Sequence, residues 1–154
     1  MTLDEAKEFA AIYHHKFVVL QYMLPIIQEL MKRAEEHDNS KFTEEEFPAL
    51  VEAMEDIKKF PFGTPEYDEM RKKWEAPFNA HYKKNRHHPE HHPNGIEDMD
   101  LVDIVEMLCD WKSASMRQES QGAIKKSIQI GAEKYNLSPQ LVKILINTAK
   151  ACKM

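Results

Sequence analysis

Glycine and cysteine are both scarce in this chain of 154 residues, which contains 4 glycines and 2 cysteines. So few glycines, together with few runs of β-branched residues, argue against a sheet-rich fold and against a glycine-rich loop that cradles phosphate. Cys109 and Cys152 are far apart and belong to no CxxC pair. They therefore provide neither a zinc knuckle nor a disulfide framework.

Long apolar runs and an excess of positive charge are also lacking. No stretch reaches membrane-spanning length, and the residues after Met1 show no signal-peptide pattern. The formal net charge is −5, so there is no general basic surface that would neutralise the phosphates of long nucleic acid. We expect a cytoplasmic protein that uses neither a membrane nor long nucleic acid as a partner.

Helical signals are present in most of the chain. Capping-box spacing of Thr2 with Glu5, and again of Thr43 with Glu46, predicts two helix starts. Pro25 predicts a kink or a division of the first helical stretch. Further helix starts are predicted at two residues that directly precede a proline: Thr64 and Ser138.

Apolar side chains recur at three- and four-residue steps in nearly every segment, which is typical of helices with one buried face. In the helix after Thr43 this face is predicted to contain Phe47, Leu50, Val51, Met54 and Ile57. The segment 86–96 is rich in His, Pro, Asn and Gly, which indicates a loop. We predict an all-α fold, a compact single domain over residues 1–154 with about six helices.

The histidines suggest a metal site. All 8 of them lie within the first 92 residues, and His37 is followed directly by Asp38. Imidazole nitrogen and carboxylate oxygen both bind divalent metals, and adjacent residues at a helix end can direct both groups at one ion. Such a dipeptide alone is more often a solvated helix end. Here His15 and His37 both continue apolar stripes, so we expect both to face the core.

Four residues on three helical segments form an ordered pattern of one histidine, a His-Asp pair and a late aspartate: His15, His37, Asp38 and Asp110. In this pattern, over residues 10 to 115, the chain resembles the HD-domain superfamily of metal-dependent phosphohydrolases. Longer strings resemble a smaller family of mostly uncharacterised HD-like proteins of bacteria and their viruses: His15 to Val18, His37 to Phe42, His81 to His88, and Glu106 to Trp111.

The resemblance implies a ligand set for one divalent metal, consisting of His15, His37, Asp38 and Asp110. A second ion would be held by His81 together with His87 or His88, with His87 slightly favoured. Nitrogen and oxygen ligands of this kind suit Mn, Fe, Co or Zn, with Mg also considered, and the sequence does not choose among them. His91 and His92 are expected to be solvated loop residues.

The implied reaction is hydrolysis of a small phosphorylated metabolite, a nucleotide in particular, with Asp38, Glu106 and Lys41 as catalytic residues. A bound metal would lower the pKa of water and polarise a phosphoryl oxygen. Glu106 could orient a ligand histidine or transfer a proton, although an ordinary surface glutamate fits the same spacing. Four basic residues beside the ligands could stabilise phosphate charge or form a solvated patch: Lys41, Lys83, Lys84 and Arg86.

Three aromatic residues could take part in binding, and two other functions are also considered. Trp74, Tyr82 and Trp111 could stack on a nucleobase, but aromatics at helical spacing are more often core, and we expect Trp111 there. The alternative functions are an HD-type diiron oxygenase and a helical interaction protein with a structural metal. Metal content and oxygen consumption would distinguish the hydrolase from the oxygenase, whereas a structural metal predicts unfolding on metal loss and no turnover. The oligomeric state is left open.

Overall fold

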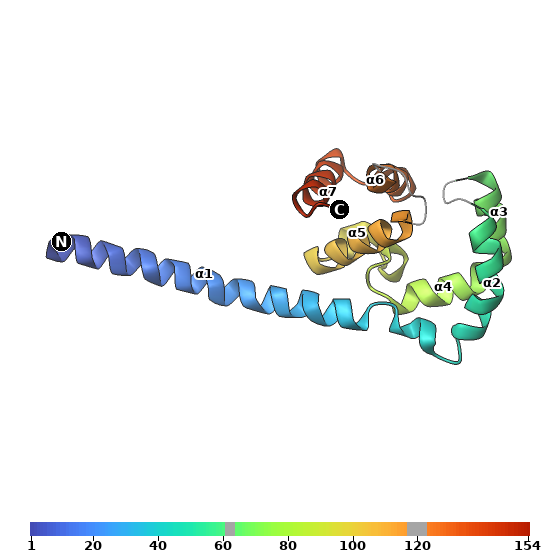
Figure 1. Ribbon diagram of the computed structural model, residues 1–154, viewed down its shortest axis with the longest axis horizontal. Helices are drawn as coiled ribbons and strands as arrows, with labels where there is room; N and C mark the ends of the chain where they lie inside the picture. The colour runs from blue at the N-terminus through green and yellow to red at the C-terminus, as the bar shows by residue number, and fades with distance from the viewer. Residues whose placement is uncertain (61–63, 117–122) are drawn as a thin grey trace. The chain divides into compact units, whose positions relative to one another are not determined.

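The computed structural model describes residues 1–60, 64–116 and 123–154. It divides into two units, Met1–Glu36 and His37–Met154, each of which is considered by itself. Within the described residues all regular structure is helical, comprising seven α-helices and three 3₁₀ helices (Figure 1). The predicted all-α fold is therefore confirmed, with one helix more than expected.

The first unit is a single helix, α1 (Leu3–Glu36). It begins with the predicted capping box, since the Glu5 backbone N–H donates to Thr2 Oγ1 at 3.2 Å and the Thr2 N–H donates to Glu5 Oε2 at 2.7 Å. Pro25 lies inside the helix, so the segment does not divide there. A proline removes one backbone hydrogen bond, and a helix of 34 residues retains those on both sides. No α1 residue is buried.

The second unit contains the remaining helices: α2 (Phe47–Lys59), α3 (Pro65–Lys73), α4 (Glu75–Lys84), α5 (Leu101–Met116), α6 (Ala123–Lys134) and α7 (Pro139–Ala151). Its 3₁₀ helices are η1 (Asn39–Phe42), η2 (Pro89–His91) and η3 (Gly95–Asp98). The predicted starts at Thr64 and Ser138 are confirmed, because each side chain accepts a hydrogen bond of 3.2 Å from the backbone three residues later.

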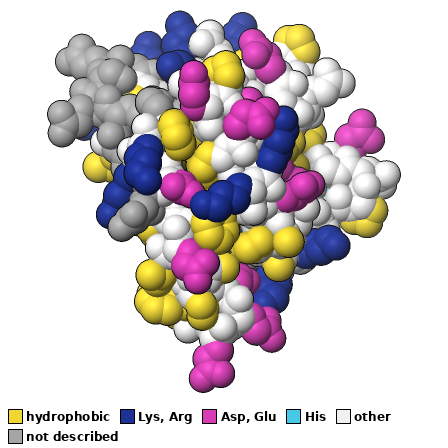
Figure 2. Space-filling model, turned by 90° about the vertical axis from the view of Figure 1, so that its right-hand side faces the viewer, with side chains coloured by type: hydrophobic (Ala, Val, Ile, Leu, Met, Phe, Trp, Pro, Cys, Tyr) yellow, Lys and Arg dark blue, Asp and Glu magenta, His cyan; other side chains and the backbone are white. Residues whose placement is uncertain are grey.

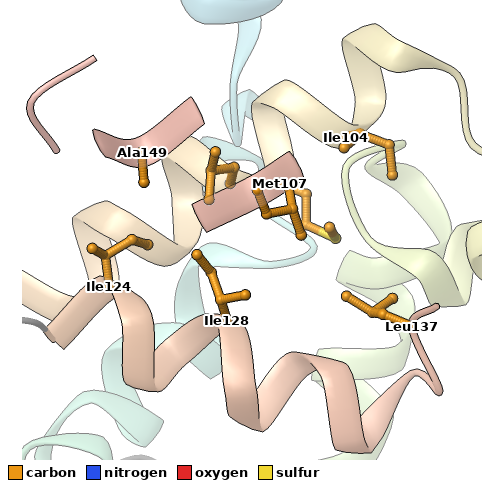
Figure 3. Close-up of a cluster of buried hydrophobic side chains, with 8 residues drawn as sticks. Ile104, Met107, Ile124, Ile128, Leu137 and Ala149 are labelled. Atoms are coloured by element: carbon orange, nitrogen blue, oxygen red, sulfur yellow. The ribbon is translucent and has the colours of Figure 1, made fainter. Parts of the chain in front are cut away.

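The hydrophobic core of the second unit forms between α5, α6 and α7 (Figure 3). Its buried members are Ile104, Met107, Leu108, Ile124, Ile128, Leu137, Leu145 and Ala149. Trp111 packs against this cluster, as expected, and lies so close to Gly131 that a Cβ there would be 2.2 Å from the indole. Burial of each large side chain contributes about 1.5–3 kcal/mol, so the core fixes the orientation of α5.

The start of α2 differs from the prediction. Glu46 precedes the helix, but its side chain makes no cap hydrogen bond. Thr43 Oγ1 donates instead to the Ser40 carbonyl at 2.7 Å. The Glu46 carboxylate is buried and lies 2.8 Å from Nδ1 of His81. A carboxylate gains more from an imidazole in a buried position than from an exposed backbone N–H, so the predicted capping box is wrong.

The buried face of α2 also differs from the prediction. Phe47 and Val51 are 52% and 54% exposed, whereas Ala53 is buried. Burial of the Ile57 side chain lies outside what the structure describes. The apolar residues of this face instead form one wall of a cavity, which is described below.

Two further features concern membrane-spanning potential and surface charge. None of the described helices is both long and apolar enough to cross a membrane. On the face drawn in Figure 2, basic and acidic side chains lie interspersed with hydrophobic ones. The described residues on this face therefore form no extended surface of one charge.

Candidate metal centre

Four imidazoles of the second unit converge on the carboxylate of Asp38. Nε2 of His81 and of His87 lie 3.2 and 3.5 Å from Asp38 Oδ1. Nε2 of His37 lies 3.4 Å from Asp38 Oδ2, and Nε2 of His88 lies 3.1 Å from Nε2 of His81. The cluster therefore presents one ring nitrogen from each histidine toward a single carboxylate.

The backbone at Asp38 explains how its side chain reaches this position. Asp38 follows α1 and precedes η1 with a φ of 57°, in the left-handed region that aspartate tolerates better than most residues. Lys41, one turn later, forms an ion pair with Asp38 Oδ2. Burial opposes ionisation of Asp38, but the neighbouring His81 and Lys41 outweigh it and hold the pKa of this carboxyl well below its ordinary range.

The segment after α4 that contains His87 and His88 is positioned by the hydrogen bonds of Asn85 and Arg86. The Asn85 amide donates to the His81 carbonyl at 2.8 Å and to Ser40 Oγ at 2.8 Å. Arg86 then donates to both carboxylate oxygens of Asp103 on α5, at 3.1 and 2.9 Å. These bonds fix the segment that leads into His87 and His88.

Two buried glutamates orient three of the imidazoles. Glu106 Oε1, on α5, lies 2.8 Å from Nδ1 of His37 and 3.0 Å from Nδ1 of His87. Glu46 Oε2 lies 2.8 Å from Nδ1 of His81. Because an ionised carboxylate only accepts hydrogen bonds, each of these rings can donate its Nδ1 proton to a glutamate, and a metal ion bound at Nε2 would leave those bonds intact. This is the support that metal-binding histidines require.

The pKa values of His88 and His37 are shifted in opposite directions. Burial, followed by the nearby His87 and His81, lowers the pKa of His88 to about 2, so this imidazole is neutral and free to act as a ligand. The hydrogen bond to Glu106 is the main cause that raises the pKa of His37, against the opposing effect of burial. A metal ion that binds His37 would therefore compete with a proton.

The donor set fits a metal ion. Donor atoms of Asp38, His81, His87 and His88 lie within 4.8 Å of one another, as do those of His37, Asp38 and Asp110. Asp38 Oδ1 and His87 Nε2 are buried and have no hydrogen-bond partner among the described residues. Buried polar atoms without partners are costly, and a cation between them would satisfy both.

The structure thus brings together five of the six predicted ligands, namely His37, Asp38, His81, His87 and Asp110. His15 lies in the first unit and is exposed on α1, so its role as a ligand stays a prediction. The sequence left His87 and His88 as alternatives, whereas both reach the cluster. Glu46 was missed because its spacing from Thr43 matched a capping box.

The basic residues near the cluster are largely engaged. Arg86 pairs with the buried Asp103, and Lys84 lies 3.5 Å from Glu46. Lys41 pairs with Asp38 and remains the basic residue closest to the donor atoms. Two other histidines bind backbone carbonyls instead of facing the cluster: His91 to Lys83 at 2.7 Å and His92 to Arg86 at 2.9 Å.

A cavity of about 450 Å³ adjoins the cluster. His81, His88 and Asp110 form part of its wall. This volume lies within the range of small-molecule sites. A ligand in the cavity could therefore reach the donor atoms.

Comparison with known proteins identifies a family but not an activity. No curated protein and no solved structure matches this chain. The model of one family, DUF5662, a family of unknown function, matches residues 4–151. Since this match spans nearly the whole sequence, the chain belongs to the DUF5662 family.

Proposed function

We propose that this protein is a metal-dependent phosphohydrolase that acts on a small phosphorylated metabolite, with a nucleotide as the leading candidate. The observation that carries the proposal is the convergence of Nε2 atoms from His37, His81 and His87 on Asp38. Carboxylates lie against Nδ1 on the far side of these rings, an arrangement that would support the imidazoles as ligands. The resemblance of the sequence to HD-domain phosphohydrolases supports the same conclusion.

The ligands divide into two overlapping groups around Asp38. One contains His81, His87 and His88, and the other contains His37 and Asp110. Because Asp38 belongs to both groups, the centre could hold one or two divalent ions, and we propose this number. The abundance of imidazole favours Mn, Fe, Co or Zn over Mg, which prefers oxygen ligands and water.

Each residue has a defined part in the proposed reaction. Asp38 and the histidines around it would hold the divalent ion, which would supply a water of lowered pKa and a Lewis acid for the phosphoryl group. Glu106 keeps the Nδ1 protons of His37 and His87 in place, which holds both rings in position. The Lys41 ammonium, beside Asp38 and on the cavity wall, offers positive charge to a phosphate.

A second candidate function is an oxygenase with two iron ions, favoured by the four imidazoles of the cluster. It differs from a hydrolase in its need for oxygen and for a redox-active metal. A structural metal is the third possibility. In that case chelation would unfold the protein and no phosphoester would be turned over.

The decisive experiment is metal analysis of protein purified without chelators, followed by assays with the matched metal. We expect one or two transition-metal ions per chain and release of inorganic phosphate from a panel of nucleotides and simple phosphoesters without oxygen. Oxygen consumption with two irons would favour the oxygenase. Protein that retains no metal in the presence of Mn, Fe, Co or Zn would contradict all three functions.

A further inference from the structure

We propose that the cavity beside the metal centre selects phosphoesters whose organic part is flat and apolar and carries a second anionic group, which Arg71 binds. The inference rests on the proposed function only for the position of the phosphoryl group at the metal centre. The second anion is a carboxylate or a phosphate, because a guanidinium recognises both through paired hydrogen bonds.

The cavity walls are mainly apolar and aromatic. Leu50, Val51 and Met54 of α2 form one part of the lining. Seven aromatic side chains contribute as well: Phe42, Phe47, Tyr67, Phe78, Tyr82, Trp111 and Tyr135. A flat apolar group gains both burial and ring stacking in such surroundings.

Tyr82 contacts both His88 of the metal centre and Arg71. Its ring centroid is 4.5 Å from that of His88, and the Arg71 guanidinium carbon is 5.3 Å from the same Tyr82 centroid. The guanidinium also lies 5.6 Å from the ring of Phe78. Arg71 and His88 therefore contact one common aromatic ring, and both line the same cavity, so a ligand about one ring wide could reach both.

Arg71 differs from the two lysines of the cavity wall in that both lysines have a carboxylate partner. Lys41 is paired with Asp38, and Lys134 lies 2.8 Å from the Glu90 carboxylate. Within residues 1–60, 64–116 and 123–154, Arg71 contacts the faces of two rings and forms no ion pair. A half-buried guanidinium without a counter-ion in an apolar cavity is costly, and a ligand anion would remove that cost.

The test compares equilibrium binding of non-hydrolysable ligands to the metal-loaded full chain. Phenylphosphonate has one anionic group, and 4-carboxyphenylphosphonate adds a second across the ring. We expect the carboxylate to tighten binding about tenfold or more in the unaltered protein, as a charge-assisted hydrogen bond would. A third ligand with a phosphonate in place of the carboxylate determines which anion is preferred.

Two variants locate the effect. Arg71→Gln should abolish the preference for the second anion, so that 4-carboxyphenylphosphonate binds no more tightly than phenylphosphonate. Lys72→Gln is the control, because Lys72 is the next residue on α3, is exposed and pairs with Glu69. Helical content and metal stoichiometry should be the same in all three proteins.

Equal affinities in the unaltered protein, or a preference that survives Arg71→Gln, would overturn the inference. Both outcomes are read from binding and require no turnover. A protein that hydrolyses phosphoesters without this preference would refute only the role of Arg71. A protein that shows the preference but no hydrolysis would refute only the proposed reaction.

Discussion

Oε1 of Glu106 lies 2.8 Å from Nδ1 of His37, although 69 positions separate the two residues in the sequence. The same oxygen lies 3.0 Å from Nδ1 of His87. One buried carboxylate thus orients two imidazoles that come from different segments, and both rings turn Nε2 toward Asp38. Glu106 can therefore control metal affinity without being a ligand.

Replacing Glu106 by Gln should lower metal affinity about 10–100-fold, as loss of a supporting carboxylate does at other metal sites. The amide has nearly the same shape, but it holds the two imidazoles less firmly because it lacks the negative charge. Competition with a chelator of known affinity measures the change. Glu97→Gln, on the exposed surface of η3, serves as control. Equal affinities in the two variants would exclude this role for Glu106.

Asp38→Asn should cause the largest loss of metal binding, because it removes the charge that both ligand groups share. Asparagine tolerates the left-handed backbone of this position, so the local fold should persist. We expect the metal-free protein to lose about 1–2 kcal/mol of unfolding free energy, since the ion pair with Lys41 disappears. Isothermal titration and urea denaturation measure the two effects.

His14→Ala is the control for Asp38→Asn, because His14 is exposed on α1. It should leave metal affinity and any phosphoester hydrolysis unchanged. Full metal binding by Asp38→Asn, or comparable damage from His14→Ala, would show that the His-Asp pair is only a helix end.

Replacing His81 or His88 by Ala should reduce the metal content from two ions to one, if both ligand groups are filled. The group that contains His37 and Asp110 would remain. Mass spectrometry of the native protein counts the ions. His91→Ala should retain both, since His91 binds the Lys83 carbonyl outside the cluster. A stoichiometry that does not respond to His81 or His88 would remove them from the site.

Metal affinity should fall with decreasing pH below the raised pKa of His37. In the metal-free protein Glu106 favours the protonated ring, so an ion that binds His37 must release that proton. Below this pKa each pH unit should lower the apparent affinity about tenfold for each proton displaced. Titrations in buffers of different ionisation enthalpy count the protons. Affinity that stays constant across this range would show that His37 is not a ligand.

Local signals in the sequence predicted the fold well where neighbouring residues decide the outcome. Thr2 with Glu5, and Ser138 before Pro139, make the hydrogen bonds expected from their spacing. Thr43 and Glu46 have the same spacing, yet the Glu46 carboxylate faces His81, 35 residues later. The spacing of Thr43 and Glu46 cannot show that His81, which is distant in the sequence, competes for the Glu46 carboxylate.

The candidate site could likewise be predicted only where neighbouring residues reveal it. The adjacency of His37 and Asp38, and the position of Asp110 on a helix, were visible in the sequence. The turn that brings both His87 and His88 to Asp38 depends on the contact between Arg86 and Asp103, which no periodic pattern reveals. The aromatic cavity likewise joins residues from five helices.

Helix α5 carries Met107 and Leu108 into the core and Glu106 and Asp110 to the metal centre. A helix turns as one body, so repacking of the core that rotates α5 would move both carboxylates relative to the histidines. Methionine is the most adaptable of the core side chains. Directed evolution of metal preference could therefore begin at Met107, without altering any residue that touches the ion.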